Sequence, residues 1–308
     1  MIFPIADLLD EQQSIKWVEK YFHPKRLRCP GRGATTKYAR ESRARKRGLV
    51  DYRCRKCQST YNLYTGTVFA GSKLEPRRVV LLLRGVCKGE PAAALAEELA
   101  LSRQCVHRWR KRIQQNAYAL PSEAPLTDAE TETDEMFQNA GKKGERHADP
   151  DDPPRRRANK RRGHGTYEND RPPVVGTVGR RTGQCRLRVC GHTDGATLRR
   201  HVHGYTRPRA ACYTDEWRGY DRVERARRAV CHGAGEWARD DDGDGVREVH
   251  VNTIEGLWAT ARNFQRPFRG VHKKHLKYYL AMCEHHINLK RTTPKFIAQL
   301  VAERQPVT

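Results

Sequence analysis

The order of strand-like and helix-like segments after residue 130 most constrains what this chain can fold into. The pattern predicts a strand at 131–137, a hairpin of strands at 173–178 and 185–189, a helix at 193–203, a strand at 210–214 and long helices from residue 253 onward. Strands interspersed with helices in this way build a mixed α/β domain. We therefore predict a mixed central sheet with flanking helices for residues 131–292.

Changes in composition divide the rest of the chain into smaller parts. Residues 1–75 contain a helix candidate at 11–22, followed by segments rich in Cys, Gly, Thr and Tyr that predict short strands. Residues 76–117 are predicted to be helical. The stretch 118–130 holds two prolines and few apolar residues, which is typical of a linker. Residues 293–308 remain as a C-terminal tail.

The chain is strongly basic, with 60 Lys and Arg residues, 36 Asp and Glu residues and a net charge of +24. Arginines form two clusters, the first within a long predicted loop at 138–172: Arg155, Arg156, Arg157, Arg161 and Arg162, then Arg222, Arg225, Arg227 and Arg228. Nucleic acid is the natural partner, because guanidinium groups bind phosphate oxygens through two donors. A ribosome-associated protein, or a basic protein without such a partner, is the alternative.

Three further features bear on where the chain works. It has no run of 18 or more apolar residues, so no membrane span is predicted. Residues 1–10 lack the basic and then apolar pattern of a signal peptide. The ten cysteines include a single CxxC pair, which favours reduced thiols in the cytoplasm over a disulfide framework.

The CxxC pair suggests a zinc ribbon in the N-terminal part. Cys54 and Cys57 have the spacing of a zinc knuckle, and Cys29 offers a third thiolate. Arg32 stands where a complete ribbon would carry a second cysteine, and His23 is the nearest spare ligand. Because a structural zinc site needs four ligands, a zinc-bound ribbon and a degenerate, metal-free ribbon both remain open.

Two short helices after this head have the pattern of a helix-turn-helix. A small apolar helix is expected at 91–99, and Ser102 can cap a basic helix at 103–115. Base edges would be read by Arg103, Gln104 and His107, and phosphates would be bound by Arg110 and Lys111. The alternative is an ordinary pair of basic surface helices.

Three acids stand out in this basic chain: Asp134, Asp215 and Glu255. The first two come from predicted strands and the third from the start of a predicted helix. Clustered carboxylates can hold the two Mg²⁺ ions that activate a hydroxyl nucleophile and stabilise a leaving oxygen. On a strand, Glu132 shares a face with Asp134, whereas Glu135 points the other way.

Each acid also has a plainer interpretation. Asp134 can be a solvated charge at the end of a strand, and Asp215 can cap a following helix. Glu255 can complete a capping box with Asn252 as the cap. The acidic run at 240–245 is similar to a calcium loop, but Val251 occupies the twelfth position where that loop needs glutamate, so we interpret it as a solvated loop.

Several short motifs, in this order, carry a resemblance to a known family. They are Tyr52-Arg53-Cys54-x-x-Cys57, Thr65-Gly66-Thr67-Val68-Phe69, Thr133-Asp134-Glu135, Thr214-Asp215-Glu216-x-x-x-Tyr220, His250-Val251-Asn252-Thr253-Ile254-Glu255-Gly256-Leu257-Trp258, Gly270-Val271-His272-Lys273-Lys274-His275-Leu276 and Tyr278-Tyr279-Leu280. The chain resembles the DDE transposases of prokaryotic insertion sequences, in the ISXO-like group related to Merlin elements. The resemblance spans residues 20–292.

This resemblance implies an RNase H-like catalytic domain that cleaves DNA at element ends and joins it to target DNA with Mg²⁺ or Mn²⁺. Asp134 and Asp215 would be the first two catalytic acids, and Glu255 the third, with Asn252 as the alternative. Arg262 would hold a DNA phosphate, and Lys273 and Lys274 are further candidate DNA contacts. Such a protein would work as a homo-oligomer on DNA at the nucleoid. A non-catalytic DNA-binding protein or a decayed transposase copy is the alternative function.

Overall fold

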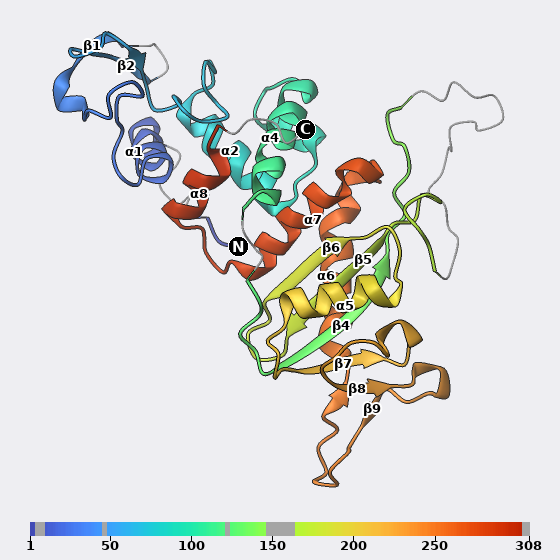
Figure 1. Cartoon of the computed structure of the whole chain (residues 1–308). Helices are drawn as coiled ribbons and strands as arrows, with labels where there is room; N and C mark the ends of the chain where they lie inside the picture. The colour runs from blue at the N-terminus through green and yellow to red at the C-terminus, as the bar shows by residue number, and fades with distance from the viewer. Residues whose placement is uncertain (4–9, 45–47, 121–123, 146–163, 304–308) are drawn as a thin grey trace. The chain divides into compact units, whose positions relative to one another are not determined.

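The computed structural model describes residues 1–3, 10–44, 48–120, 124–145 and 164–303 (Figure 1). The chain forms two compact units: one contains residues 1–120 and 289–308, and the other contains residues 121–288. The arginines at 155–157 and 161–162, with the middle of the loop predicted at 138–172, lie outside the described residues. No helix in the described part of the chain is long and apolar enough to cross a lipid bilayer.

Helices make up most of the first unit, with one small sheet. The helices are α1 (Glu11–Phe22), α2 (Pro76–Lys88), α3 (Ala92–Glu98), α4 (Arg103–Tyr118) and α8 (Pro294–Val301). An antiparallel sheet joins β1 (Ala39–Ala44), β2 (Val50–Cys54) and β3 (Thr60–Tyr61), and the 3-10 turn η1 (Thr36–Tyr38) precedes β1. Each helix predicted here from the sequence is present.

Local capping and aromatic packing explain where these helices lie. The Asp10 carboxylate accepts the N–H of Gln12 at the start of α1, and the Ser102 hydroxyl accepts the N–H of Cys105 at the start of α4. Trp17 stacks on Tyr21 with ring centroids 4.1 Å apart. The Asn116 side chain donates to the carbonyls of Leu300 and Ala302, at 2.7 Å each, and so fixes the C-terminal helix to α4.

The second unit is a mixed α/β domain built on a five-stranded sheet of order β6-β5-β4-β7-β8. The strands are β4 (Glu130–Phe137), β5 (Pro173–Gly179), β6 (Cys185–Val189), β7 (Ala211–Asp215) and β8 (Ala226–Val230). The pairs β4–β5 and β5–β6 are antiparallel, whereas β4–β7 and β7–β8 are parallel. The predicted mixed central sheet is therefore confirmed.

Helices cover both faces of this sheet. Val175 of β5 packs with Leu198 and Val202 of α5 (Gly195–Tyr205). The next residue, Gly176, faces α6 (Asn252–Gln265), where a Cβ atom would come within 2.5 Å of the Trp258 ring. Because successive strand residues point to opposite faces, α5 and α6 lie on opposite sides of the sheet, as Figure 1 shows. The helix α7 (Lys273–Asn288) packs on β6.

The sequence missed the edge strand β8. This strand overlaps the second arginine cluster, and apolar residues alternate only weakly along it. Arg227 donates to Asp221 and to the carbonyl of Asp215, and Arg228 donates to Glu248, so polar contacts stabilise this edge. A small antiparallel ribbon of β9 (Ala238–Arg239) and β10 (Val249–His250) flanks the acidic run at 240–245.

Candidate active site

Strand β4 divides its acidic side chains between the two faces of the sheet. Glu130 accepts a hydrogen bond from the Tyr213 hydroxyl, and Glu132 and Asp134 contact residues of α6. Glu135, by contrast, accepts a hydrogen bond from the Tyr220 hydroxyl, and Tyr220 belongs to the core on the α5 side. The alternation predicted from the sequence is thus confirmed.

Strand register brings the two aspartates together at the end of the sheet. In the parallel pair β4–β7, Glu132 lies opposite Tyr213. Extending that register by two residues places Asp134 opposite Asp215, with both side chains on the α6 face. Neighbouring strands lie about 4.8 Å apart, so the two carboxylates share one small region.

Asp134 lies in an environment that opposes its negative charge. Burial is the main cause that raises its pKa, to about 6, and the charges of Asp215 and Glu255 act in the same direction. Trp258 Nε1 donates to Asp134 Oδ2 at 2.8 Å, which stabilises the ionised form. A half-buried carboxylate beside two other acids is an unfavourable arrangement for a bare protein and a favourable one for a cation.

Glu255, on the first turns of α6, is the third acid of this group. Its carboxylate is half exposed and lies 4.0 Å from Nδ1 of His232. It is close enough to Asp134 to raise the pKa of that residue. Asn252, the alternative third residue, is exposed at the first position of the helix.

A buried carboxylate fixes α6 to β4, and the sequence did not single it out. Glu132 is fully buried. It accepts hydrogen bonds of 2.9 Å from Arg180 Nε, the Thr253 hydroxyl and the Ile254 N–H. The cap residue of α6 is Val251, without a side-chain cap, so the alternative capping box of Asn252 and Glu255 is wrong. A residue distant in the sequence supplies the cap.

The spacing of the three acids bears on which metal ions they could hold. Asp134, Asp215 and Glu255 are not among the groups of described residues whose ligand atoms all lie within 4.8 Å of one another. A single ion bound to all three would require such closeness, because Mg²⁺–oxygen distances are about 2.1 Å. Three carboxylates that approach one face of the sheet without such closeness could instead hold two ions between them. The donor set therefore fits two hard divalent cations.

Glu135 is a second perturbed acid that sequence reasoning left without a role. Burial raises its pKa to about 7, and the charge of neighbouring Asp134 adds to this effect. Its partner Tyr220 is fully buried, and the hydrogen bond between them is 2.6 Å long. The only sequence signal was its place directly after Asp134. Contacts on the other face of the sheet place it away from Trp258 and α6.

The predicted DNA-reading helix presents most of its candidates to solvent. Arg103, Gln104, His107 and Lys111 are exposed on α4. Arg110 is different, because it is only 1% exposed and its guanidinium donates to the carbonyl of Glu90. This burial contradicts the predicted phosphate contact of Arg110. The helical pattern of the sequence did not show that position 110 lies on the buried face of α4.

The basic candidates in the second unit also differ in availability. Arg262 is exposed on α6. Lys274 is exposed as well, with its ammonium 3.1 Å from Glu145. Lys273 donates to the carbonyl of Tyr167 at 2.9 Å and pairs with Asp170 at 3.0 Å, and its side chain is only 11% exposed. These contacts hold the Lys273 ammonium within the protein, and its part in DNA binding stays a prediction.

The three candidate zinc ligands of the first unit come together as predicted. The Sγ atoms of Cys29, Cys54 and Cys57 all lie within 4.8 Å of one another, and Cys29 Sγ is 3.4 Å from Cys57 Sγ. Two thiolates on one tetrahedral zinc ion lie about 3.8 Å apart, so the set fits such an ion. The Ser59 hydroxyl is the main cause that lowers the pKa of Cys57, to about 7. His23 instead contacts the carbonyl of Leu63, so it is not the fourth ligand.

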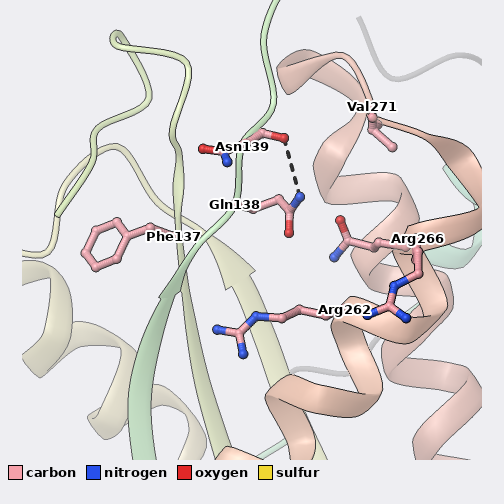
Figure 2. A pocket seen from close by; sticks show the side chains of 8 residues that line it. Phe137, Gln138, Asn139, Arg262, Arg266 and Val271 are labelled. Atoms are coloured by element: carbon pink, nitrogen blue, oxygen red, sulfur yellow. Dashed lines mark hydrogen bonds between the residues drawn. The ribbon is translucent and has the colours of Figure 1, made fainter. Parts of the chain in front are cut away.

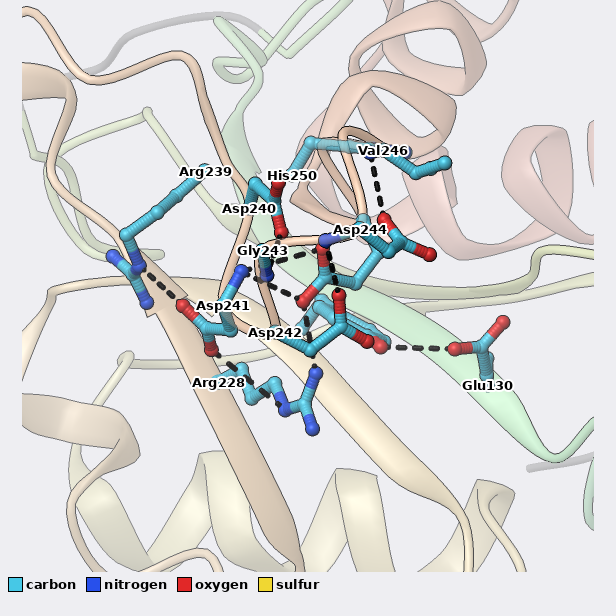
Figure 3. Close-up of polar contacts among 12 residues, drawn as sticks. Glu130, Arg228, Arg239, Asp240, Asp241, Asp242, Gly243, Asp244, Val246 and His250 are labelled. Carbon is cyan, nitrogen blue, oxygen red and sulfur yellow. Dashed lines mark hydrogen bonds and ion pairs between the residues drawn. The ribbon is translucent and has the colours of Figure 1, made fainter.

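The acidic loop at 240–245 is stabilised by its own backbone (Figure 3). Asp240 accepts the N–H groups of Gly243 and Gly245, and Asp244 accepts that of Val246. Its carboxylates are exposed or half-exposed, and Asp241 pairs with Arg239. The carboxylate oxygens of Asp240, Asp242 and Asp244 also lie within 4.8 Å of one another, so the interpretation of this run as a purely solvated loop stays a prediction.

Comparisons with known proteins indicate the family of this chain. Residues 133–288 match the family of the ISXO2-like transposase domain. An uncharacterised protein in transposable element ISH50 of Halobacterium salinarum is 32% identical over 234 residues, which cover 74% of this chain and 75% of that protein.

Two solved structures are more distant. A pre-cleavage Mos1 transpososome matches with 10% identity and a TM-score of 0.21, over 74% of this chain and 79% of that chain. A Mos1 strand transfer complex matches with 13% identity and a TM-score of 0.20, over 67% of this chain and 72% of that chain. Likeness at these TM-scores supports no structural conclusion.

Proposed function

Because this chain belongs to the ISXO2-like transposase family, we propose that it cuts DNA at the ends of an insertion sequence and joins those ends to target DNA. The proposal is supported by the placement of Asp134 and Asp215 on the adjacent strands β4 and β7, on the face of the sheet that α6 with Glu255 covers, within a chain of net charge +24. As an enzyme that acts on chromosomal DNA, it would work at the nucleoid, and one copy would bind each element end.

Strand topology supports an RNase H-like fold for the second unit. Three antiparallel strands, β6-β5-β4, continue into two parallel strands, β7 and β8, with helices on both faces. The first two acids lie on adjacent strands, and the third comes from a helix that packs on the same face. This arrangement matches what the family resemblance implies.

Each residue of the site has a distinct part in the proposed mechanism. Asp134, Asp215 and Glu255 would hold two Mg²⁺ or Mn²⁺ ions, with Asn252 the alternative to Glu255. When bound, such ions lower the pKa of a hydroxyl nucleophile and stabilise the leaving oxygen. Trp258 orients the Asp134 carboxylate through its 2.8 Å hydrogen bond. Exposed Arg262 would bind a phosphate of the strand beside the cut.

Recognition of the element ends would depend on the first unit. Arg103, Gln104 and His107 are exposed at the start of α4, where a recognition helix contacts base edges. Lys111, one turn further along, would contact a phosphate. We propose that α3 and α4 act as a helix-turn-helix.

We expect the protein to cleave and join the DNA that flanks its own gene only when a divalent cation is present. The experiment incubates the full-length protein with labelled duplexes from both flanks and a target plasmid, in Mg²⁺, in Mn²⁺ or in EDTA. Cleaved ends and joined products should form with either metal, and both should fall to background in EDTA.

Three other outcomes would count against this function. Cleavage without joining would indicate a nuclease of similar fold. Salt-sensitive binding without cleavage would indicate a decayed copy or a DNA-binding regulator. Cleavage that persists in EDTA would overturn the role of the acids as metal ligands.

We also propose that Cys29, Cys54 and Cys57 bind one structural zinc ion through three thiolates. Cobalt titration of the full-length protein should produce thiolate-to-metal absorption that saturates near one equivalent. The variant Cys54→Ser should lose most of that absorption. Cys105→Ser, which changes a half-exposed cysteine of α4, should retain it. Absorption that is absent from the wild-type protein would establish a metal-free ribbon.

A further inference from the structure

A polar pocket of about 300 Å³ lies beyond the end of β4. Its walls come from that strand end and the C-terminal half of α6, both of which also carry the acids of the active site (Figure 2). The lining residues that matter here are Gln138, Asn139, Arg262, Gln265, Arg266 and Val271. The volume lies at the lower end of the range of small-molecule pockets.

Unsatisfied amide groups line this pocket. Gln265 is only 5% exposed, and neither its Nε2 nor its Oε1 has a hydrogen-bond partner among the described residues. The Oδ1 atom of Asn139 is likewise buried without a partner in that part of the chain. Buried polar groups are nearly always hydrogen-bonded, because the loss of water is otherwise uncompensated. A ligand with its own donors and acceptors would satisfy them.

The rim of the pocket carries positive charge. Arg262 and Arg266 are both exposed, and neither forms an ion pair with a residue that the structure describes. Figure 2 shows Arg262 and Gln138 directed into the space between β4 and α6. Guanidinium groups bind phosphate oxygens through paired donors. A ligand that fits this pocket therefore has a phosphate group and a planar ring with adjacent hydrogen-bond donors and acceptors, as a nucleotide has.

We propose that this pocket receives an unpaired base of the DNA substrate. The Gln265 amide hydrogen-bonds to the base edge, and Arg262 and Arg266 bind the adjoining phosphates. The inference rests on the proposed function, because it takes the substrate to be DNA. It adds a base-binding site to the three acids and assigns Gln265 as the residue that contacts the base. Enzymes that extract a base from the stack commonly read its edge in this way.

Chain geometry indicates which base is involved. Gln138 is four residues beyond Asp134 and directly follows the last residue of β4, which corresponds to about 13 Å at 3.3 Å per residue. Successive nucleotides of a stacked strand rise about 3.4 Å, and an extended strand spans more per nucleotide. The unpaired base therefore lies roughly two to four nucleotides from the phosphate that is cut.

The test uses 2-aminopurine, a fluorescent base whose emission is quenched by stacking. Duplexes from the element end carry it at each position near the cut, and the full-length protein is added without divalent cation so that the strand stays intact. Emission should rise at one position roughly two to four nucleotides from the cut and stay low at the others. Gln265→Ala should abolish that rise, because the unpaired base loses its hydrogen-bond partner.

A matched control and a second readout separate this role from a structural one. Gln184→Ala changes an exposed glutamine in the turn between β5 and β6 and should leave the emission unchanged. Affinity is also measured for four duplexes that differ only in the base at that position. The preference of the wild-type protein for one base over the others should fall roughly tenfold to a hundredfold in Gln265→Ala.

The outcomes distinguish the pocket from the function on which it rests. If the wild-type protein cleaves the duplex but emission rises at no position, the pocket assignment is overturned and the transposase function stands. The same conclusion follows if the rise persists in Gln265→Ala. If Arg262→Ala weakens binding equally for all four bases and leaves the emission unchanged, then the rim binds phosphate alone. A protein that neither binds nor cleaves the duplex would overturn both proposals.

Discussion

Replacing Asp134 or Asp215 with asparagine is expected to reduce metal-dependent cleavage of an element-end duplex about a thousandfold or more. Asparagine keeps the shape of the side chain and one oxygen but removes the negative charge that a hard cation requires. The stabilisation that a bound cation gives to a phosphoryl-transfer transition state is worth several kcal/mol, and each 1.4 kcal/mol corresponds to a factor of ten in rate. The measurement is single-turnover cleavage in Mg²⁺ at saturating protein.

The two variants should lose activity without losing the fold. Asp134 is half-buried beside two other acids, and burial raises its pKa to about 6. Removal of that charge is expected to increase the resistance of the second unit to unfolding in EDTA. Glu130→Gln is the matched control, because Glu130 lies on the same strand and face but is exposed, with the Tyr213 hydroxyl as its partner. This variant should cleave at the wild-type rate.

The same assay decides the identity of the third acid. Glu255→Gln should lose activity nearly as strongly as Asp215→Asn, whereas Asn252→Ala should retain most of it. The reason is that Glu255 acts electrostatically on Asp134, while Asn252 is exposed at the first position of α6. Wild-type cleavage by Glu255→Gln, combined with an inactive Asn252→Ala, would reverse the assignment. Wild-type cleavage by Asp134→Asn or Asp215→Asn would refute the acid site as a whole.

The sequence predicted those parts of the fold that local patterns encode. The hairpin of β5 and β6 concentrates apolar residues on both sides of a clear turn signal, and the predicted bounds of these two strands and of β4 differ from the observed ones by at most one residue. Strand β8 could not be found in this way. Its sequence, Ala-Arg-Arg-Ala-Val, has little apolar character, and its stability comes from ion pairs with residues elsewhere in the chain.

The candidate site shows the same division between local and distant determinants. Asp215 ends β7 and Asp134 lies within β4, and both strands were predicted from the sequence. The burial of Arg110 and the ion pair of Lys273 depend on which side of a helix is covered and on which loop lies nearby, so the local sequence could not reveal either. The cap of α6 comes from Glu132, 122 residues before Ile254, and no pattern within the helix reveals it.

Among residues of the second unit outside the apolar core, replacement of Glu132 should therefore lower the free energy of unfolding most. Glu132→Ala is expected to lower the free energy of unfolding by about 3–5 kcal/mol, because it leaves Arg180 without its carboxylate and the first turn of α6 without its acceptor. Hydrogen exchange of the β4 and α6 amides, measured on the full chain, localises the effect. Glu130→Ala on the same face should change it by less than about 1 kcal/mol.

Loss of Glu132 should also be visible in metal dependence, because the residue joins the strand that carries Asp134 to the helix that carries Glu255. Glu132→Gln retains an oxygen for the Ile254 N–H and should stay folded at low temperature. Its half-saturating Mg²⁺ concentration for cleavage should nevertheless rise about tenfold, since loss of the ion pair with Arg180 loosens the start of α6. If Glu132→Gln loses stability but keeps wild-type Mg²⁺ dependence, Glu132 stabilises the fold without positioning the acids.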